Sequence, residues 1–215
     1  EAHRFHLAQR TGIELSETRG MLIPTPAWKQ RVRKEQWFPG DTANMSIGQG
    51  DVLVTPLDMA CFAASVARGE VSTRPTLLHR ADAPAQHTEP IGLTAAQRDA
   101  LLDGMEGCTT VGTAKVLTQI ADLRIPGLRI AGKTGTAQVS GNKNVAWFIC
   151  FAPLEHPEIA VAVTVEGDTP GETYGGGLNA APIAQGVLRA WWAKKNQPHS
   201  GGVTLPGAVR TTSLP

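Results

Sequence analysis

The sequence predicts an α+β domain in which an antiparallel sheet is flanked by helices. The first observation is a set of three segments rich in β-branched residues and joined by short turn-like stretches: 123–139, 145–152 and 159–166. Strands joined by such short turns lie side by side and antiparallel. The second observation is a set of helical patterns before and after these strands: 56–68, 95–106 and 180–194.

Length and charge narrow the class of protein. A chain of 215 residues, 41% hydrophobic and 18% charged, is large enough to bury a core and has the composition of a globular domain. The formal net charge of +1 gives no reason to expect nucleic acid as a partner. There is no apolar run of 18 residues, and neither a starting Met nor a signal peptide is present, so we expect a processed or excised piece.

The helix at 56–68 has the clearest boundaries. Thr55 is placed to cap it, Pro56 and Asp58 suit its first turn, and Gly69 suits its end. Its apolar spacings of three and four predict one buried stripe, made of Leu57, Ala60, Cys61, Ala64 and Ala67. The two later helices are expected to begin after Thr94 and at Asn179 and to bury two further sets: Leu101, Leu102 and Met105 in one, and Ile183, Val187, Leu188 and Trp191 in the other.

The remaining segments carry weaker signals. Residues 2–9 are predicted to be the last turns of a helix, and 16–28 are turn-rich. The basic run of Lys29, Arg31, Arg33 and Lys34 is interpreted as a solvated face rather than a polyanion site, because the whole chain is nearly neutral. Loops, one short strand and a tail fill the other stretches: a strand at 76–79, loops at 107–114, 141–144 and 167–177, and a flexible tail at 196–215.

Metal, cofactor and nucleotide sites are not indicated. Cys61, Cys108 and Cys150 lack metal-type spacing and are odd in number, so we expect buried free thiols. The six histidines are scattered along the chain. The Gly48-Gln49-Gly50 stretch lacks the preceding strand that a dinucleotide fingerprint requires.

The stretch from 129 to 139 carries the most chemistry. A strand that ends in Lys133-Thr134-Gly135-Thr136 presents a cation, two hydroxyls and open backbone amides along one edge. These groups suit an anionic, carbonyl-bearing ligand. The alternative is an ordinary edge strand whose solvated Lys133 discourages aggregation.

This stretch resembles the third signature of the serine-type penicillin-recognising enzymes, whose three signatures are Ser-x-x-Lys, Ser-x-Asn and Lys-Thr/Ser-Gly. The wider chain resembles class B penicillin-binding proteins, the monofunctional peptidoglycan transpeptidases, and among them the penicillin-binding protein 2 type. The resemblance runs from about residue 11 to 190 and rests on colinear segments: Thr11-Gly12-Ile13-Glu14-Leu15, Pro24-Thr25-Pro26-Ala27-Trp28-Lys29, Gly40-Asp41-Thr42, Ser46-Ile47-Gly48-Gln49-Gly50, Val54-Thr55-Pro56-Leu57, Ala146-Trp147-Phe148, Phe151-Ala152-Pro153 and Pro157-Glu158-Ile159-Ala160-Val161.

The resemblance implies roles for individual residues. Lys133 and Thr136 are implied to be catalytic: the lysine shapes the proton network and faces the ligand carboxylate, and the Thr136 N–H is one oxyanion-hole donor. Thr134, Gly135 and Thr136 are implied to bind substrate, through hydroxyls that hold the carboxylate and a glycine that leaves room for a peptide along the strand edge. Gly132 is expected to let neighbouring structure approach closely.

The chain also departs from the family pattern. Neither Ser-x-x-Lys nor Ser-x-Asn occurs in residues 1–132, where the family's order requires them. Ser140-Gly141-Asn142-Lys143 formally fits both patterns, but it follows the third signature and falls in a predicted turn, so we interpret it as a coincidence. Residues 1–195 are therefore expected to be the C-terminal portion of a transpeptidase domain whose nucleophile lies elsewhere in the protein.

As a whole, the resemblance implies the penicillin-binding protein/β-lactamase-like fold and a peptidoglycan D,D-transpeptidase that acts through a serine acyl-enzyme. It implies D-Ala-D-Ala stem peptides and β-lactams as ligands, a membrane glycosyltransferase as partner, and no cofactor. The implied location is the outer face of the cytoplasmic membrane, with an anchor outside this chain. Two alternatives stay open: a non-catalytic binding module of the same fold, and a relative of the β-lactamases or β-lactam sensors.

Overall fold

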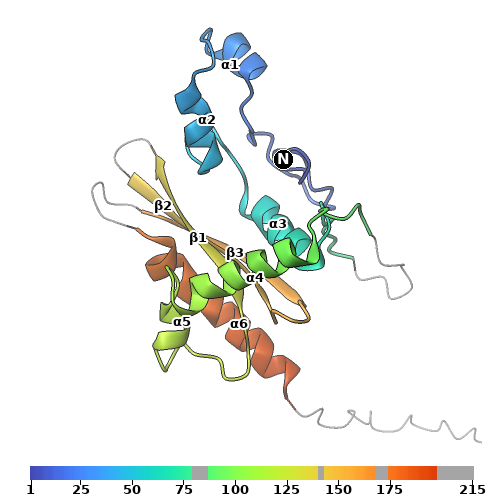
Figure 1. Ribbon diagram of the computed structural model, residues 1–215, viewed down its shortest axis with the longest axis vertical. Coiled ribbons are helices and arrows are strands. Elements are labelled where there is room, and N and C mark those ends of the chain that lie inside the picture. Colours follow the sequence, from blue (N-terminus) through green and yellow to red (C-terminus); the bar gives the residue numbers. More distant parts are fainter. Residues whose placement is uncertain (79–86, 140–142, 168–173, 198–215) are drawn as a thin grey trace, which may run out of the picture.

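The computed structural model describes residues 1–78, 87–139, 143–167 and 174–197. A three-stranded antiparallel sheet lies at its centre, with helices on both faces and an N-terminal arm that carries two short helices (Figure 1). The helices are α1 (Pro26–Val32), α2 (Pro39–Ser46), α3 (Pro56–Arg68), α4 (Ala95–Thr110), α5 (Val116–Gln119) and α6 (Ala181–Lys195), the last preceded by the π-helical turn η1 (Gly176–Ala180). This arrangement confirms the predicted α+β class.

The sheet has the order β1 (Ala131–Val139), β2 (Lys143–Ala152) and β3 (Ile159–Glu166). Both pairings are antiparallel, and Gly135 lies opposite Trp147 in the first of them. The predicted third strand matches β3, whereas β1 starts eight residues later than the predicted start at Leu123. Pro126 cannot donate to a strand ladder and Gly127 has a φ of +74°, so the chain turns before β1 begins.

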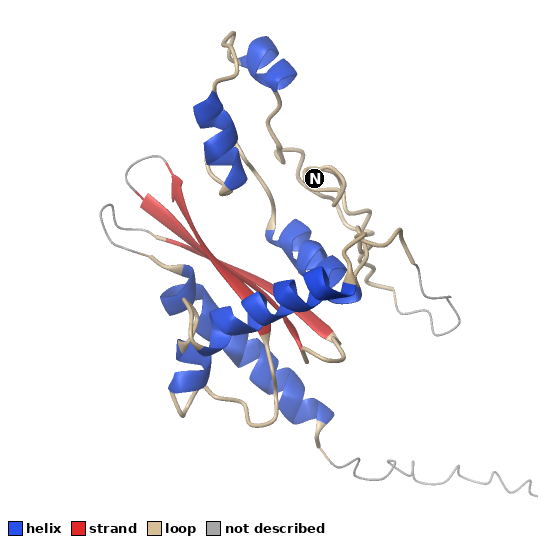
Figure 2. Ribbon diagram, viewed as in Figure 1, coloured by secondary structure: helices blue, strands red, loops and turns tan. Residues whose placement is uncertain are grey.

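The two faces of the sheet are covered differently (Figure 2). One face, with Phe148 and Cys150 fully buried in β2, packs against α5, η1 and α6. Much of this contact is made by small residues, including Ala146, Ala180, Ala181 and Ala184, none of which has any exposed surface. The layers therefore approach closely on this face.

On the opposite face, coverage is incomplete. Phe151 packs with Val66 and Ala67 of α3, at one end of the sheet. Further along the same face, Trp147 and Ile149 line a cavity instead of packing under a helix. The alternation of side chains along β2 puts all three residues with odd numbers on this side.

The helix starts and ends are predicted better than their buried faces. Helix α3 has the expected bounds, with a reciprocal capping pair between Thr55 and Asp58 and a left-handed Gly69 at its end. Helix α4 continues to Thr110, beyond the predicted end at 106, and α6 follows a π-helical turn that was not foreseen. The predicted stripes were wrong in part: Ala63 and Val66 are buried in α3, while three residues expected inside are exposed, namely Leu101, Ile183 and Val187.

The N-terminal predictions needed more correction. Residues 2–9 form turns, not a helix, and His6 and Ala8 have positive φ angles. Helices α1 and α2 were not predicted, although both begin with a proline at the first helical positions. In the basic run, Arg31, Arg33 and Lys34 are exposed as expected.

Lys29 contradicts the solvated interpretation, since it is only 8% exposed. Its Nζ lies 2.7 Å from Oδ2 of Asp41 and 3.5 Å from Oε2 of Glu35. Because a buried ammonium needs a charged partner, this contact joins α1 to α2 and gives the arm its shape.

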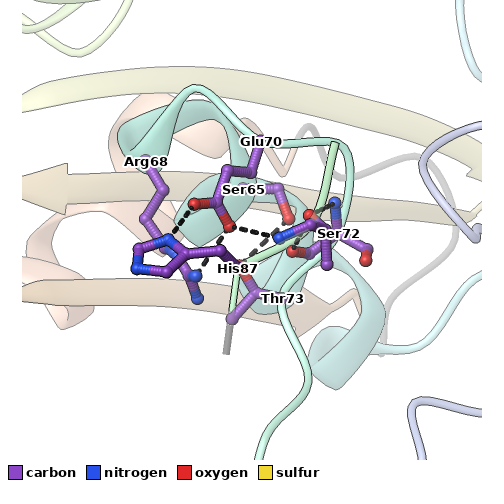
Figure 3. Close-up of polar contacts among 7 residues, drawn as sticks. Ser65, Arg68, Glu70, Ser72, Thr73 and His87 are labelled. Atoms are coloured by element: carbon purple, nitrogen blue, oxygen red, sulfur yellow. Dashed lines mark hydrogen bonds and ion pairs between the residues drawn. The ribbon is translucent and has the colours of Figure 1, made fainter. Parts of the chain in front are cut away.

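The segment after α3 does not form the predicted strand at 76–79, and its contacts centre on the carboxylate of Glu70. Residues 76–78 form no strand, and His79 lies outside the described residues. Glu70 pairs with Arg68 at 2.6 Å and with Nδ1 of His87 at 2.7 Å (Figure 3). It also accepts a hydrogen bond from the Thr88 N–H. Since a carboxylate only accepts, Nδ1 of His87 carries the proton in this contact. The hydrogen bond from His87 is the first cause that lowers the pKa of Glu70.

The cysteines are free thiols, as predicted. Cys108 and Cys150 are buried and Cys61 is half-buried. Burial raises the pKa of Cys61 to about 11 and that of Cys150 to about 12, so both are thiols at neutral pH. Within the described ranges, no three His, Cys, Asp or Glu side chains gather in a way that suits a metal ion. None of the helices described there combines the length and hydropathy needed to cross a bilayer.

The Lys29–Asp41 pair predicts a pH-dependent stability of the arm. The hydrogen bond from Lys29 lowers the pKa of Asp41, and the same bond raises the pKa of Lys29. The contribution of Asp41 is therefore present above its ordinary pKa of about 3.9 and is lost as the pH falls through its lowered value. We expect Asp41→Asn to lower Tm at pH 7, and the difference from the unsubstituted protein to shrink in acid below about pH 3.9.

Thermal unfolding at pH 7 and in acid measures this effect. Asp103→Asn is the matched control, because Asp103 is an exposed carboxylate on α4. An equal loss of Tm from Asp41→Asn at both pH values contradicts the assignment of the effect to the ion pair.

Gly132 predicts a steric effect in the core. A methyl group placed on Gly132 would lie 2.6 Å from Cζ of Phe148, which is fully buried. We expect Gly132→Ala to reduce the free energy of unfolding by about 1–3 kcal/mol, as overpacking does in cores. Gly186→Ala is the control, because nothing lies within 4 Å of that position on α6. Denaturant unfolding in which both variants are equally stable would overturn the prediction.

Candidate active site

Strand β1 is held in place at its start by α4. Arg129 donates from Nε and from its terminal nitrogen NH2 to the two carboxylate oxygens of Glu106, both at 2.6 Å, and it also pairs with Glu155. The hydrogen bond from Arg129 is the first cause that lowers the pKa of Glu106. The buried hydroxyl of Thr109 donates to the Ile130 carbonyl at 2.8 Å. These contacts determine where the following residues of β1 lie.

Along the edge of β1 that faces away from β2, the backbone groups of every second residue point outward. The Thr134 carbonyl accepts from Nζ of Lys133 at 2.8 Å, and the Thr136 carbonyl accepts from the side-chain amide of Gln49 at 3.1 Å. In an antiparallel strand, the N–H and C=O of one residue point to the same side. The N–H groups of Thr134 and Thr136 therefore face this open edge too, away from β2.

Gln49 was not singled out as a site residue by the sequence. It lies in the glycine-rich turn after α2, and Gly48 and Gly50 on either side of it both have positive φ angles. Its contact with Thr136 spans 87 residues of sequence and joins the N-terminal arm to the sheet. The two glycines of the turn were visible in the sequence, but not the strand that the turn would reach.

Thr134 has a second partner that sequence reasoning missed. Its hydroxyl oxygen lies 2.6 Å from the hydroxyl oxygen of Thr113, in the turn between α4 and α5. The sequence suggested only that Thr113 belongs to a loop of small residues. No periodic pattern links a residue in this turn to a strand 21 positions later.

The backbone of the site is packed from behind by two glycines of η1. A methyl group on Gly176 would lie 2.1 Å from the Trp147 carbonyl oxygen and 2.7 Å from the Gly135 carbonyl oxygen. A methyl group on Gly177 would lie 1.8 Å from the Thr113 carbonyl oxygen. Only residues without a side chain allow this approach, so η1 touches both the β1–β2 pair and the Thr113 turn. Gly132 is close to Phe148 for the same reason, which confirms the expectation for Gly132.

A cavity of about 1180 Å³ lies between the arm and the sheet. Lys133, Thr134, Gly135 and Thr136 all line it, so the structure brings the four predicted site residues to one wall. The opposite side is mostly apolar and comes from the arm and the start of α3, including Pro24, Trp37, Met45, Val54 and Met59. Lys133 and Thr136 are exposed on this wall, and Thr134 and Gly135 are half-buried.

The groups on this wall are suited to binding a ligand and polarising its carbonyl group. It offers an ammonium group, two hydroxyls and the outward N–H groups of alternate residues, which suit an anion and a carbonyl oxygen. Ser46 also lines the cavity, but its hydroxyl donates to the Thr42 carbonyl one turn back in its own helix. Ser140, Gly141 and Asn142 lie outside the described residues, so the interpretation of that tetrapeptide as a coincidence stays a prediction.

Comparison with known proteins identifies the family. Residues 1–189 match the family model for the penicillin binding protein transpeptidase domain. The chain belongs to the penicillin-binding protein transpeptidase family. The predicted resemblance is thereby confirmed, and so is the penicillin-binding protein/β-lactamase-like fold. The chain spans about a third of the length of the relatives that it matches.

Individual relatives agree with the penicillin-binding protein 2 type. The peptidoglycan D,D-transpeptidase MrdA of Acinetobacter baumannii is 32% identical over 244 residues, which cover 98% of this chain and 33% of that protein. The crystal structure of Pseudomonas aeruginosa PBP2 in complex with WCK 5153 has a TM-score of 0.70 and 32% identity, covering 88% of this chain and 42% of that one. A complex between Helicobacter pylori PBP2 and MreC has a TM-score of 0.67 and 27% identity, covering 88% and 35%.

The packing of η1 predicts that two adjacent glycines of this chain tolerate substitution differently. We expect Gly176→Ala to reduce the free energy of unfolding by about 2–3 kcal/mol, because its methyl group meets backbone atoms that cannot rotate away. Gly175→Ala should change the stability by less than about 1 kcal/mol, since its backbone is extended and nothing lies within 4 Å. Denaturant unfolding of the two variants checks this, and equal losses would contradict the close contact.

Proposed function

We propose that this chain supplies one wall of the acyl-transfer site of a peptidoglycan D,D-transpeptidase. The observation that carries the proposal is the open edge of β1, where Lys133, Thr134 and Thr136 line the cavity and the backbone groups of Thr134 and Thr136 point away from β2. An extended peptide can pair with such an edge, and an ammonium and hydroxyls beside it suit the peptide's terminal carboxylate. The names of the relatives, which are D,D-transpeptidases, support this reading.

The proposed reaction divides the site between this chain and the rest of the protein. A serine and its activating lysine, together with the Ser-x-Asn pair, are expected in the remaining part, because residues 1–132 contain neither pattern. The serine Oγ attacks the carbonyl carbon of the penultimate D-Ala and releases the terminal D-Ala as an amine. The resulting ester then passes its acyl group to an amine on a neighbouring strand.

Within that reaction, this chain stabilises charge. The Thr136 N–H donates to the oxygen that becomes negative in the tetrahedral state, a contact that contributes roughly 3–4 kcal/mol in known oxyanion holes. Lys133 holds the ligand carboxylate by charge, and the hydroxyls of Thr134 and Thr136 donate to it. Gly135 leaves the strand edge open to the peptide backbone. No metal or organic cofactor takes part in the proposed steps.

Ligands, partners and location follow from the same proposal. β-Lactams acylate the serine in place of the stem peptide and are held by the same wall. The longer protein works beside a membrane glycosyltransferase on the outer face of the cytoplasmic membrane, with an anchor in another part of the protein. The relative solved in complex with MreC supports the view that proteins of this type act in assemblies.

Labelling with a fluorescent penicillin tests the proposal. We expect a covalent band, after denaturing electrophoresis, on the longer protein that contains this chain and none on the isolated chain. In the longer protein, Lys133→Met should slow labelling by about 10- to 100-fold, the range expected for a lost hydrogen bond to a charged group.

Lys143→Met is the matched control, because this lysine begins β2 and does not line the cavity. A covalent band on the isolated chain would show that the nucleophile lies within it and would sink the proposed division of the site. Equal labelling of both variants would remove Lys133 from the proposed wall.

A further inference from the structure

We propose that Thr113 is a positioning residue for carboxylate recognition, which it serves by orienting the hydroxyl of Thr134. The inference rests on the proposed function and adds a residue from outside the Lys-Thr-Gly signature. The observation behind it is the 2.6 Å separation between the two hydroxyl oxygens, on a part of β1 that faces the cavity.

The direction of this hydrogen bond matters for the ligand. Each hydroxyl has one proton to donate and can also accept. If Thr134 donates to Thr113, its proton is used inside the protein and is lost to an anion. If Thr113 donates, the Thr134 proton is free to point at a carboxylate. An anionic ligand selects the second arrangement, because it can only accept.

The surroundings of Thr113 favour its role as donor. Sγ of Cys108 lies 3.5 Å from the Thr113 hydroxyl oxygen, so a thiol S–H can donate to it. With the thiol as donor, a chain of donors runs from Cys108 through Thr113 to Thr134 and out to the ligand. Hydrogen bonds arranged in such a chain polarise one another and strengthen the terminal donor.

The Thr113 turn is held firmly enough for such a task. The Gly112 N–H donates to the Gly107 carbonyl at 2.8 Å, and the Ala114 N–H donates to the Cys108 carbonyl at 2.9 Å. On the other side, Gly177 packs directly against the Thr113 carbonyl. The turn is therefore enclosed between the end of α4 and η1, and its hydroxyl does not depend on a mobile loop.

A purely structural role for Thr113 makes a different prediction. If the contact only fastens the turn to β1, removing the hydroxyl should lower stability and affect all ligands alike. If Thr113 orients the Thr134 donor, the loss should appear chiefly with ligands that carry a carboxylate. The charge of the ligand therefore separates the two roles.

The test compares benzylpenicillin with its methyl ester as acylating ligands of the longer protein. Thr113→Val keeps the shape of the side chain but removes the hydroxyl, and we expect it to slow acylation by benzylpenicillin about 5-fold, the effect of one ordinary hydrogen bond. Acylation by the neutral ester should stay within about 2-fold of the unsubstituted rate, since the ester needs no such donor. Thr113→Ser keeps a hydroxyl at this position, so benzylpenicillin should acylate this variant at about the rate of the unsubstituted protein.

Two further variants complete the design. Thr110→Val is the control, because that hydroxyl donates to the Glu106 carbonyl of its own helix and, among the described residues, makes no contact with β1. In a Thr134→Val background, adding Thr113→Val should have no further effect on either ligand, because the donor that it orients is gone.

The outcomes separate the inference from the proposed function. If neither ligand acylates the unsubstituted longer protein, the proposed function fails, and the inference fails with it. If the unsubstituted protein is acylated and Thr113→Val slows both ligands equally, or neither, the inference alone is overturned. A loss that persists in the Thr134→Val background overturns it as well.

Discussion

Within the part of the chain that the structure describes, strand β1 pairs along one side only, and the other elements are organised around that one-sided pairing. Its partner β2 sets the register, and Arg129 and Thr109 anchor its start to α4. The unpaired side keeps its backbone groups available, apart from the carbonyls that Lys133 and Gln49 occupy. An edge of this kind is normally hidden or blunted by charge, and here it borders a cavity. Most of the contacts that support it come from behind or from its start, and Gln49 is the side chain of the arm that bonds a carbonyl on the open edge.

The elements that the sequence predicted well are those with strong local signals. Helix α3 has a capping threonine, a first-turn proline and a terminating glycine within 15 residues, and β3 is an unbroken run of β-branched and small residues. Helices α1 and α2 were missed because they have only seven and eight residues and are marginal on their own. They depend on the Lys29–Asp41 pair, which spans 12 positions and has no period in the sequence. The start of β1 was misplaced because Ile125 and Ile130 before it are buried without belonging to a strand.

The residues of the candidate site also divide into those that the sequence predicted and those that only the structure revealed. Lys133 to Thr136 are consecutive, so the sequence was enough to place them together on one edge. Gln49 and Thr113 reach that edge from 87 and 21 positions away, and only the folded chain brings them there. The role of Gly176 was equally hidden, because a glycine-rich stretch before a helix looks like a loop whether or not it packs on a sheet. The distant supports of a short motif are thus the part that a single sequence leaves out.

The small residues on one face of the sheet determine which positions of the sequence can vary during evolution. On the face under η1 and α6, a methyl group added to Gly132 would meet Phe148, and one added to Gly176 of η1 would meet the Trp147 and Gly135 carbonyl oxygens, so substitutions there lower the stability. On the cavity face of the same strands, Gly135 and Trp147 border open volume. Substitutions that change the shape of the cavity can therefore accumulate on one side of β2, while the residues on its other side keep the fold stable. In this architecture, the residues of β2 that border the cavity lie on one face of the strand, and those packed in the core lie on the other.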